Sequence, residues 1–512
     1  MSRASAVAAP RLAPRLTRAQ AGIALAVAAL ALVGWHGVTT VGPGGGIDSD
    51  AYARYAQYLY ENHRLPPWEP LPEAWRNGTY EYQAPPLYEV LGALAEGLVN
   101  NLPSRRLEPG NLLVTGILWL ALFGGGILAL TAARPGLRRA GLAAVALAAL
   151  WGLNQAVALG KEQPWAAGRL LSLAALLGVA VVTALIAREV WPDRPRRMLG
   201  ASAILLAYPV AYRLGVLFHP ELLFVLCTAV AVLLFLRAGR SGWPAALGAG
   251  AGVACGLGAL TRQSAVVPIF CVLVGAAVAG RRRAVPFVAA AVAAIVLVAG
   301  PWWGYAYHTW GNPLEGNLDR PGHLLEDGQP LSFFVSFPIR SLVVHPYRPD
   351  FAGELLPQLH ADLWSDWFGA IHDGWWRQPR LAIVTASTQS VLGLVAGALG
   401  IVGFARFGVP AAWRALRGRA REDGRDLPFA FLALLAAAAL GAFVLQLLRY
   451  PQIDGDQIKS SYVFFAAPAW AVFTVSAWTG ATARSSAARV LLPAWAVLYA
   501  LSYGAATLAL FL

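Results

Sequence analysis

Long apolar segments recur along this chain, and they constrain its fold more than any other feature of the sequence. Each is roughly 18–23 residues long, enough for a helix to cross a hydrocarbon core of ~30 Å. In lipid every backbone polar group needs an internal partner, so the segments must be helices. We therefore predict an all-α polytopic membrane protein with about 13 transmembrane helices. The predicted spans are about 19–41, 110–133, 138–159, 167–188, 198–216, 220–238, 243–260, 264–280, 284–303, 381–405, 428–448, 462–481 and 490–511.

The basic residues predict the orientation of these spans. If the N-terminus is cytoplasmic, alternation places 24 of the 40 Lys and Arg residues in short loops on that side. This is the positive-inside bias of multi-pass proteins. The net charge of +13 is explained by these basic cytoplasmic loops, so we expect no nucleic-acid partner. The arginine-rich, Ala-, Gly- and Leu-rich composition suggests a bacterial plasma membrane, with the C-terminus outside.

Two stretches between the predicted spans are much longer than the other loops, residues 42–109 and 304–380. Both fall on the extracytoplasmic side, and both are rich in Trp, Tyr, Phe and Pro, which argues against disorder. We expect each loop to carry helices lying along the membrane surface. The chain then divides into an N-terminal transmembrane module, 1–303, which includes the first loop, then the second loop, and C-terminal transmembrane helices over 381–512.

The first long loop opens with two carboxylates, Asp48 and Asp50, just after the first predicted span. A helix is predicted over residues 49–64, because apolar and aromatic residues repeat there every three or four positions. Asp48 can cap this helix, since a carboxylate accepts backbone N–H bonds at a helix start. Capping needs only one acidic group, so it does not explain Asp50. The alternative is that the two carboxylates together have a catalytic or metal-binding role.

Further ionisable residues lie at the predicted outer ends of spans. Arg262 interrupts an apolar stretch and needs an anion at that depth, unless its side chain extends to lipid headgroups. Arg449 and Lys459 flank a short acidic loop, so ion pairs with Asp454 and Asp456 are the alternative to a binding role.

Two polar pairs lie close to the membrane surface as well. His219 and Glu221 surround a proline at a predicted helix start, which is also an ordinary way to begin a helix. Glu81 and Gln83 precede two prolines, where they either bind sugar hydroxyls or cap a turn.

The second long loop carries a dense aromatic run over residues 351–380. It either packs on the membrane surface, as aromatic belts do, or forms a lid that binds sugar or lipid. Carboxylates and histidines in this run do not form a recognised metal-ligand spacing: Asp362, Asp366, His372 and Asp373.

Six short motifs, in order along the chain, resemble the C-type glycosyltransferase superfamily, whose members are polytopic enzymes that use polyprenyl-phosphate sugars. The resemblance is nearest to bacterial relatives of protein mannosyltransferases and aminoarabinose transferases. Each motif is weak alone, and their order covers most of the chain. The motifs are Ile47-Asp48-Ser49-Asp50-Ala51-Tyr52, Tyr55-x-x-Tyr58-Leu59 with Leu65-Pro66, Gln83-Ala84-Pro85-Pro86-Leu87-Tyr88, His219-Pro220-Glu221, Gly258-Ala259-Leu260-Thr261-Arg262-Gln263, and Lys459-Ser460-Ser461-Tyr462 followed by Pro468.

The resemblance implies an inverting glycosyltransferase whose catalytic module is residues 1–303. A base must take the proton of the acceptor hydroxyl, and positive groups must stabilise the departing phosphate. Asp48 is the predicted base, and Asp50 shares that role or helps to hold Mg²⁺ or Mn²⁺. The acidic motif is Asp-Ser-Asp here instead of the family's Asp-Glu. Other roles follow from position: phosphate binding by Arg262, Arg449 and Lys459, substrate binding by Tyr52, Glu81, Gln83, His219 and Glu221, and metal binding by Asp48, Asp50, His219 and Glu221.

The expected substrates are a polyprenyl-phosphate-linked sugar and a lipid, glycan or protein acceptor. A polytopic transporter or lipid flippase of the cell envelope is the main alternative, and a non-enzymatic assembly scaffold is a third. A transporter predicts related halves and charges in mid-span. Neither is found in the sequence, because the charges gather in loops and at span ends.

Overall fold

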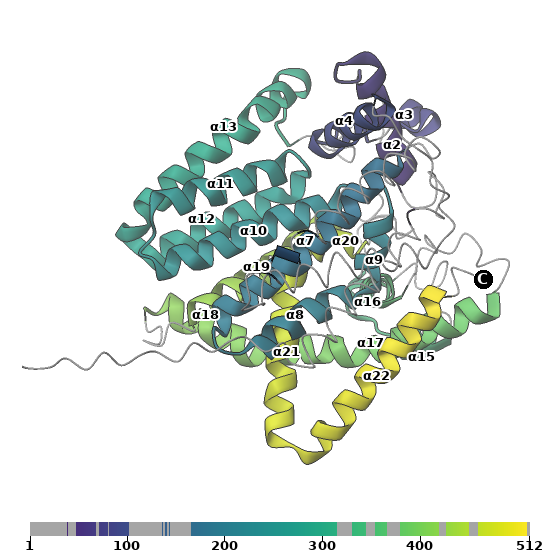
Figure 1. Ribbon diagram of the computed structural model, residues 1–512, viewed down its shortest axis with the longest axis vertical. Coiled ribbons are helices and arrows are strands. Elements are labelled where there is room, and N and C mark those ends of the chain that lie inside the picture. The colour runs from purple at the N-terminus through teal and green to yellow at the C-terminus, as the bar shows by residue number, and fades with distance from the viewer. Residues whose placement is uncertain are drawn as a thin grey trace, which may run out of the picture.

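The computed structural model describes residues 48–67, 71–79, 81–101, 165–314, 330–344, 354–365, 379–418, 426–449 and 459–508, with isolated residues at 38, 136, 139, 140 and 143. All regular elements in these ranges are helices, and none of the described residues forms a strand. Figure 1 shows the helices stacked against one another in a single bundle. The prediction of an all-α fold is confirmed.

Six described stretches are long and apolar enough to cross a membrane, or seven if one bent pair is a single span: Ala166–Val190, Glu221–Arg240, Gln263–Trp310, Val384–Leu416, Asp426–Leu448 and Ser486–Ala505. The protein is therefore a multi-pass membrane protein. The predicted count of thirteen is not reached in the described part of the chain. The predicted spans 19–41 and 110–133 lie outside the described residues, apart from residue 38, as does nearly all of 138–159.

The central helices pack against one another as one set. Helix α7 (Ala166–Val190) packs against α10 (Glu221–Arg240), which packs against α11 (Ala245–Ala259). Helices α12 (Val266–Gly280) and α13 (Val285–Trp310) follow, joined by the short turn η2 (Arg281–Ala284). At 15 residues each, α11 and α12 are only about 22 Å long, which is shorter than a hydrocarbon core.

Glycine allows α11 and α13 to approach closely. A Cβ atom on Gly252 would lie 2.3 Å from the carbonyl oxygen of Ala291, and one on Gly248 would lie 2.2 Å from that of Phe287. Small residues at a helix interface let two backbones meet in this way. On α13 the valines 285, 292 and 296 are exposed, at helical spacing, as expected of a surface that faces lipid.

The predicted span 198–216 is broken in the structure. It consists of α8 (Pro195–Leu206) and α9 (Pro209–Val216), which are bent by 64° relative to each other. Pro209 explains the break, because proline has no N–H to donate and disfavours a helical residue before it. Tyr208 accordingly has an extended backbone, with φ −70° and ψ 118°.

The C-terminal helices match the predicted segments 381–405, 428–448 and 490–511, each displaced by a few residues. The segment 462–481 is divided by a turn into a short helix and a long one. The helices are α17 (Pro379–Gly403), the π-helical turn η4 (Phe404–Gly408), α18 (Val409–Leu416), α19 (Asp426–Arg449), α20 (Ser461–Phe464), α21 (Ala467–Arg484) and α22 (Ser486–Leu508).

Both long loops contain short helices, as predicted. In the first loop, α2 (Ser49–Asn62) matches the helix expected over 49–64, and α3 (Leu71–Asn77) and α4 (Leu87–Asn101) follow. These three helices lie together at one end of the bundle (Figure 1). In the second loop the described helices are α14 (Leu331–Val335), α15 (Ile339–Val344) and α16 (Leu355–Trp364).

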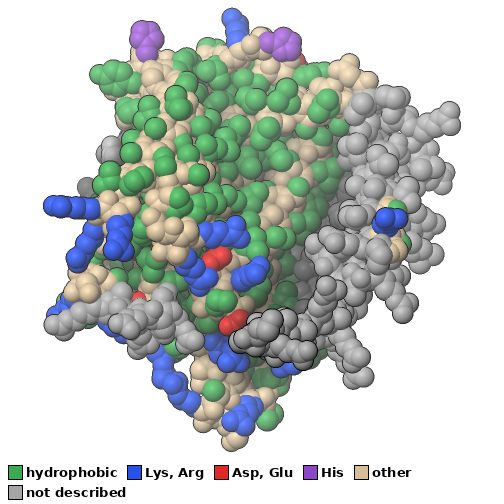
Figure 2. All heavy atoms as spheres, turned by 60° about the vertical axis from the view of Figure 1, so that its left-hand side comes forward, with side chains coloured by type: hydrophobic (Ala, Val, Ile, Leu, Met, Phe, Trp, Pro, Cys, Tyr) green, Lys and Arg blue, Asp and Glu red, His purple; other side chains and the backbone are tan. Residues whose placement is uncertain are grey.

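The surface of the bundle separates apolar and basic side chains. Figure 2 shows hydrophobic side chains covering the upper part of one face, with most of the Lys and Arg side chains gathered across its lower part. In water a continuous apolar surface of this kind would be unfavourable, whereas lipid solvates it.

Candidate active site

Four segments far apart in the sequence bring charged side chains together at one end of the bundle. They are the start of α2, the junction of α9 and α10, the turn after α11, and the residues before α20. Each lies at a helix end, where the chain emerges from the apolar interior and polar side chains can be accommodated.

Asp48 and Lys459 form the first ion pair of this site. The Lys459 ammonium donates to Asp48 Oδ2 at 2.5 Å, and both side chains are largely buried. Burial alone would raise the pKa of the Asp48 carboxyl, but the Lys459 charge outweighs it and the pKa lies below its usual range. Burial alone would lower the pKa of Lys459, yet the neighbouring Tyr462 and Asp48 raise it. Both groups are therefore charged at neutral pH.

The predicted capping role of Asp48 is wrong. Asp48 occupies the position before α2, but its side chain makes no hydrogen bond to the helix start. Its backbone is left-handed, with φ 62°, which is uncommon for a residue other than glycine. The alternative partners considered for Lys459, Asp454 and Asp456, lie outside the described residues.

Arg262 is the centre of the second group. Its Nε donates to Glu221 Oε1 at 2.9 Å, and Nη1 donates to the Tyr52 hydroxyl at 2.6 Å. Glu81 Oε2 lies 4.0 Å from Nη1. Burial would lower the pKa of Arg262, but Glu221 and its other neighbours raise it well above the usual value. The anion expected beside Arg262 is thus present within the protein, instead of lipid headgroups.

His219 lies between the two ion pairs. Its ring meets the Tyr52 ring edge-on, with centroids 5.1 Å apart, and its backbone N–H donates to the Tyr88 hydroxyl at 3.1 Å. The pKa of His219 lies well below its usual value, first because of burial and then because of the Arg262 charge. The imidazole is therefore neutral, and its Nδ1 has no partner among the described residues.

Glu81 and Gln83 lie on the first-loop side of the site. Burial and the nearby Asp48 raise the pKa of Glu81 to about 7, so this carboxyl changes charge near neutral pH. Gln83 is buried, and its Oε1 has no partner in the described part of the chain. Gln83 thus has a polar atom available to a ligand.

The structure does not place two of the predicted site residues in this group. Asp50 lies in the first turn of α2 with a half-buried side chain, and no described residue forms a hydrogen bond or ion pair with it. Arg449 ends α19, and its side chain lies outside the described residues. Their predicted roles stay predictions.

A metal site formed by Asp48, Asp50, His219 and Glu221 is not supported by the geometry. No group of three or more His, Cys, Asp or Glu residues in the described ranges could hold a metal ion. Asp48 and Glu221 instead accept from Lys459 and Arg262.

Sequence reasoning missed the role of Asp362. This fully buried carboxylate on α16 lies 2.5 Å from Arg213 of α9 and accepts from both the backbone N–H and the hydroxyl of Ser460, at 2.7 and 2.6 Å. It thereby fixes the residue next to Lys459. The position of Asp362 on an apolar helix face indicated that this carboxylate needs a buried partner. The partners lie about 100 to 150 positions away, so no local spacing in the sequence identifies them.

Together these features define a polytopic helical membrane protein with a buried, charged site at one end of its bundle. Residues 144–305 match the family model described as dolichyl-phosphate-mannose-protein mannosyltransferase. The matched segment includes His219, Glu221 and Arg262. It confirms the resemblance to the C-type superfamily of membrane glycosyltransferases. No curated protein sequence matches the chain.

Solved structures of two membrane glycosyltransferases are also similar to this chain. An oligosaccharyltransferase of Archaeoglobus fulgidus, in a complex with Zn and sulfate, is 14% identical with a TM-score of 0.45. That similarity covers 95% of this chain and 53% of the archaeal one, so the chain spans about half of its length. ArnT of Cupriavidus metallidurans, bound to undecaprenyl phosphate, is 14% identical with a TM-score of 0.37, over 89% of this chain and 76% of that one. Neither similarity identifies a substrate.

Proposed function

We propose that the protein is an integral-membrane glycosyltransferase. It transfers a sugar from a polyprenyl-phosphate donor to a lipid, glycan or protein acceptor on the extracytoplasmic face of a bacterial plasma membrane. The observation that carries the proposal is the convergence of Asp48 and Lys459 with Arg262, Glu221 and His219 at one end of the bundle. The family match over residues 144–305 supports the same class of reaction.

Asp48 is the proposed base. Its lowered pKa keeps the carboxylate ionised, so it can accept the proton of the acceptor hydroxyl. The acceptor oxygen then forms a bond to the anomeric carbon as the bond from that carbon to the phosphate oxygen breaks. The electron pair of the broken bond stays on the phosphate. A single displacement of this kind inverts the configuration of the sugar.

Lys459 and Arg262 are the proposed phosphate-binding residues. Their positive charges stabilise the negative charge that grows on the leaving phosphate. In the structure both charges are compensated, by Asp48 and by Glu221. A donor phosphate that approaches Lys459 competes with Asp48 for the ammonium, which raises the pKa of Asp48 and makes it a stronger base. Donor binding thus activates the base.

Tyr52, Glu81, Gln83, His219 and Glu221 are proposed to surround the sugar. The Gln83 amide and neutral His219 imidazole have unpartnered atoms among the described residues, and these suit sugar hydroxyls. Glu221 and Tyr52 hold the Arg262 guanidinium in place, so their contribution is to orient the phosphate.

The deciding experiment compares Asp48→Asn with wild type, using the purified protein in nanodiscs and polyprenyl-phosphate sugars as donors. We expect transfer to fall by about 10²–10⁴-fold while donor binding is retained. Glu73→Gln is the matched control, because Glu73 is an exposed carboxylate of the same loop. Asp50→Asn tests whether the second carboxylate shares the role. Unchanged transfer in Asp48→Asn would refute the assignment, and movement of the intact donor across the membrane would favour a flippase.

A further inference from the structure

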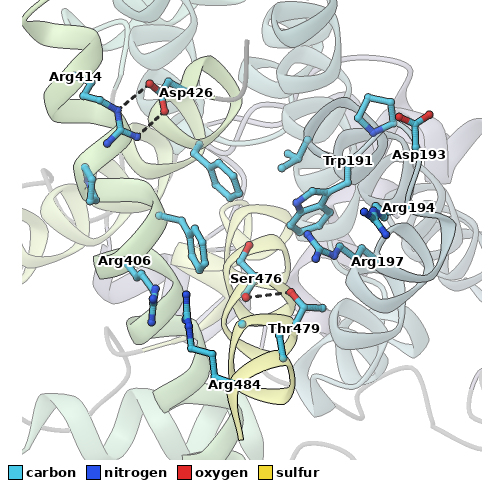
Figure 3. Close-up of a pocket in the computed structure, with 17 residues that line it drawn as sticks. Trp191, Asp193, Arg194, Arg197, Arg406, Arg414, Asp426, Ser476, Thr479 and Arg484 are labelled. Carbon is cyan, nitrogen blue, oxygen red and sulfur yellow. Dashed lines mark hydrogen bonds and ion pairs between the residues drawn. The ribbon is translucent and has the colours of Figure 1, made fainter. Parts of the chain in front are cut away.

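A cavity lies at the opposite end of the bundle from the candidate active site. It has a volume of about 620 Å³ and is enclosed by the α7–α8 junction, the η4–α18 segment, the start of α19 and the end of α21 (Figure 3). Helix α7 begins beside the candidate active site, where Trp165 meets Phe218, and ends at the cavity with Val190. Its 25 residues separate the two sites by about 37 Å. The cavity is therefore distinct from the active site.

Positive charge dominates the wall of this cavity. Five arginines line it, with only two aspartates: Arg194, Arg197, Arg406, Arg414 and Arg484, with Asp193 and Asp426. Arg414 donates two hydrogen bonds to Asp426, at 2.9 and 2.6 Å, so these two charges compensate each other. The remaining lining residues carry a formal excess of three positive charges.

Three of the arginines have no compensating partner in the described ranges. For Arg194, Arg406 and Arg484, no hydrogen bond or ion pair to a described residue is found. In Figure 3, Arg194 comes from one side of the cavity and Arg406 and Arg484 come from the other sides. Guanidinium groups gathered from separate helices into one concavity are suited to bind an anion between them.

Aromatic rings line the same cavity as the arginines. Phe407 and Phe429 stack with centroids 5.6 Å apart, and the Trp191 ring meets Phe429 edge-on. The Arg197 guanidinium lies 5.4 Å from the centre of the Trp191 ring. Arg194, Arg406 and Arg484 are themselves exposed, so the rings supply an apolar wall beside charges that stay open to solvent.

The π-helical turn η4 places Arg406 at the cavity. Pro410 has no N–H to donate to the carbonyl of Arg406 four residues earlier, so a regular helix cannot continue through this point. The chain forms a widened turn instead, and such turns occur often at functional sites. Gly403, just before it, packs directly on the Phe473 backbone, which holds the turn against α21.

We propose that this cavity binds the phosphate group of an anionic ligand, at the end of the bundle that the arginine distribution places in the cytoplasm. The volume suits a lipid headgroup or a small soluble phosphate compound. Planar guanidinium forks bind phosphate oxygens in pairs, which favours a phosphate over a neutral ligand. The shared chemistry is a phosphate mono- or diester.

The test uses the full chain in nanodiscs and has two arms. In the first, native mass spectrometry measures retention of phosphatidylglycerol against phosphatidylcholine. In the second, inorganic phosphate and pyrophosphate are titrated by calorimetry into the protein in phosphatidylcholine nanodiscs. The pocket variant is Arg406→Gln with Arg484→Gln. The matched control is Arg282→Gln with Arg283→Gln, which removes two exposed arginines from the turn η2 at the same end.

We expect wild type and control to bind in at least one arm, and the pocket variant to bind about tenfold or more weakly. Binding in the lipid arm alone identifies a headgroup, and binding in the second arm identifies a soluble phosphate. Arg484→Lys is a milder variant that keeps the charge and should lose less affinity. Absence of binding in both arms, or equal losses in the pocket and control variants, would overturn the proposal.

Discussion

The Asp48–Lys459 ion pair offers the most direct test of the site, because it can be measured without knowledge of the substrate. At 2.5 Å and an effective dielectric constant of about 20, the two charges attract by ~6–7 kcal/mol. Desolvation of both groups offsets much of this attraction. Removing one partner leaves the other charge buried and should cost about 3–5 kcal/mol of stability.

We therefore expect Asp48→Asn and Lys459→Met each to lower the thermal unfolding temperature, and the double variant to be no less stable than the worse single variant. The expected coupling energy is about 2–4 kcal/mol. Tryptophan fluorescence of the purified protein in detergent measures this cycle. If the stability loss of the double variant equals the sum of the two single losses within about 0.5 kcal/mol, the pairing is refuted.

The pH dependence of the same pair follows from the directions of its pKa shifts. The pKa of Asp48 is lowered in the folded protein, so its contribution to stability is present above the usual aspartate range and is lost as the pH falls through the lowered value. The pKa of Lys459 is raised, so its contribution is fully present below the usual lysine pKa and is lost as the pH rises through the raised value. Stability from the pair should be constant between about pH 5 and 9.

Three further predictions concern other parts of the molecule. Arg262→Gln leaves the buried Glu221 without its cation and should lower the unfolding temperature and raise the donor KM, whereas Arg262→Lys should restore much of the stability and less of the KM. Glu81 gains negative charge beside Arg262 as the pH rises through about 7, so the donor KM should increase several-fold between pH 6 and 8, a change that Glu81→Gln should abolish. Gly252→Val should lower the yield of folded protein because its side chain meets the backbone of α13, and Gly441→Ala, with open space around it, should not.

The sequence was sufficient to predict the helices but not their breaks. Long apolar segments become helices wherever they occur, since the backbone has no other partner in lipid. Hence α7, α10, α17, α19 and α22 match the predicted spans closely. Hydropathy is insensitive to a single proline, so the 64° bend at Pro209 was not predicted, although the proline itself was visible.

The site was predictable only in part for a different reason. Each charged residue at a span end could be recognised individually, because an ionisable group in an apolar environment needs a partner. The choice of partner depends on tertiary packing, and Asp48 was not matched with Lys459 because 411 positions separate them. Asp362 escaped notice likewise, since a buried carboxylate with distant partners leaves no local pattern.

The separation between Asp48 and Lys459 also has a consequence for biosynthesis. At about 5–20 residues per second, a ribosome needs about 20 to 80 s to progress from the first residue to the second. During that interval Asp48 has no Lys459 with which to pair. The candidate site is thus completed only when translation is almost finished, and a chain terminated before Lys459 would have no means of forming this ion pair.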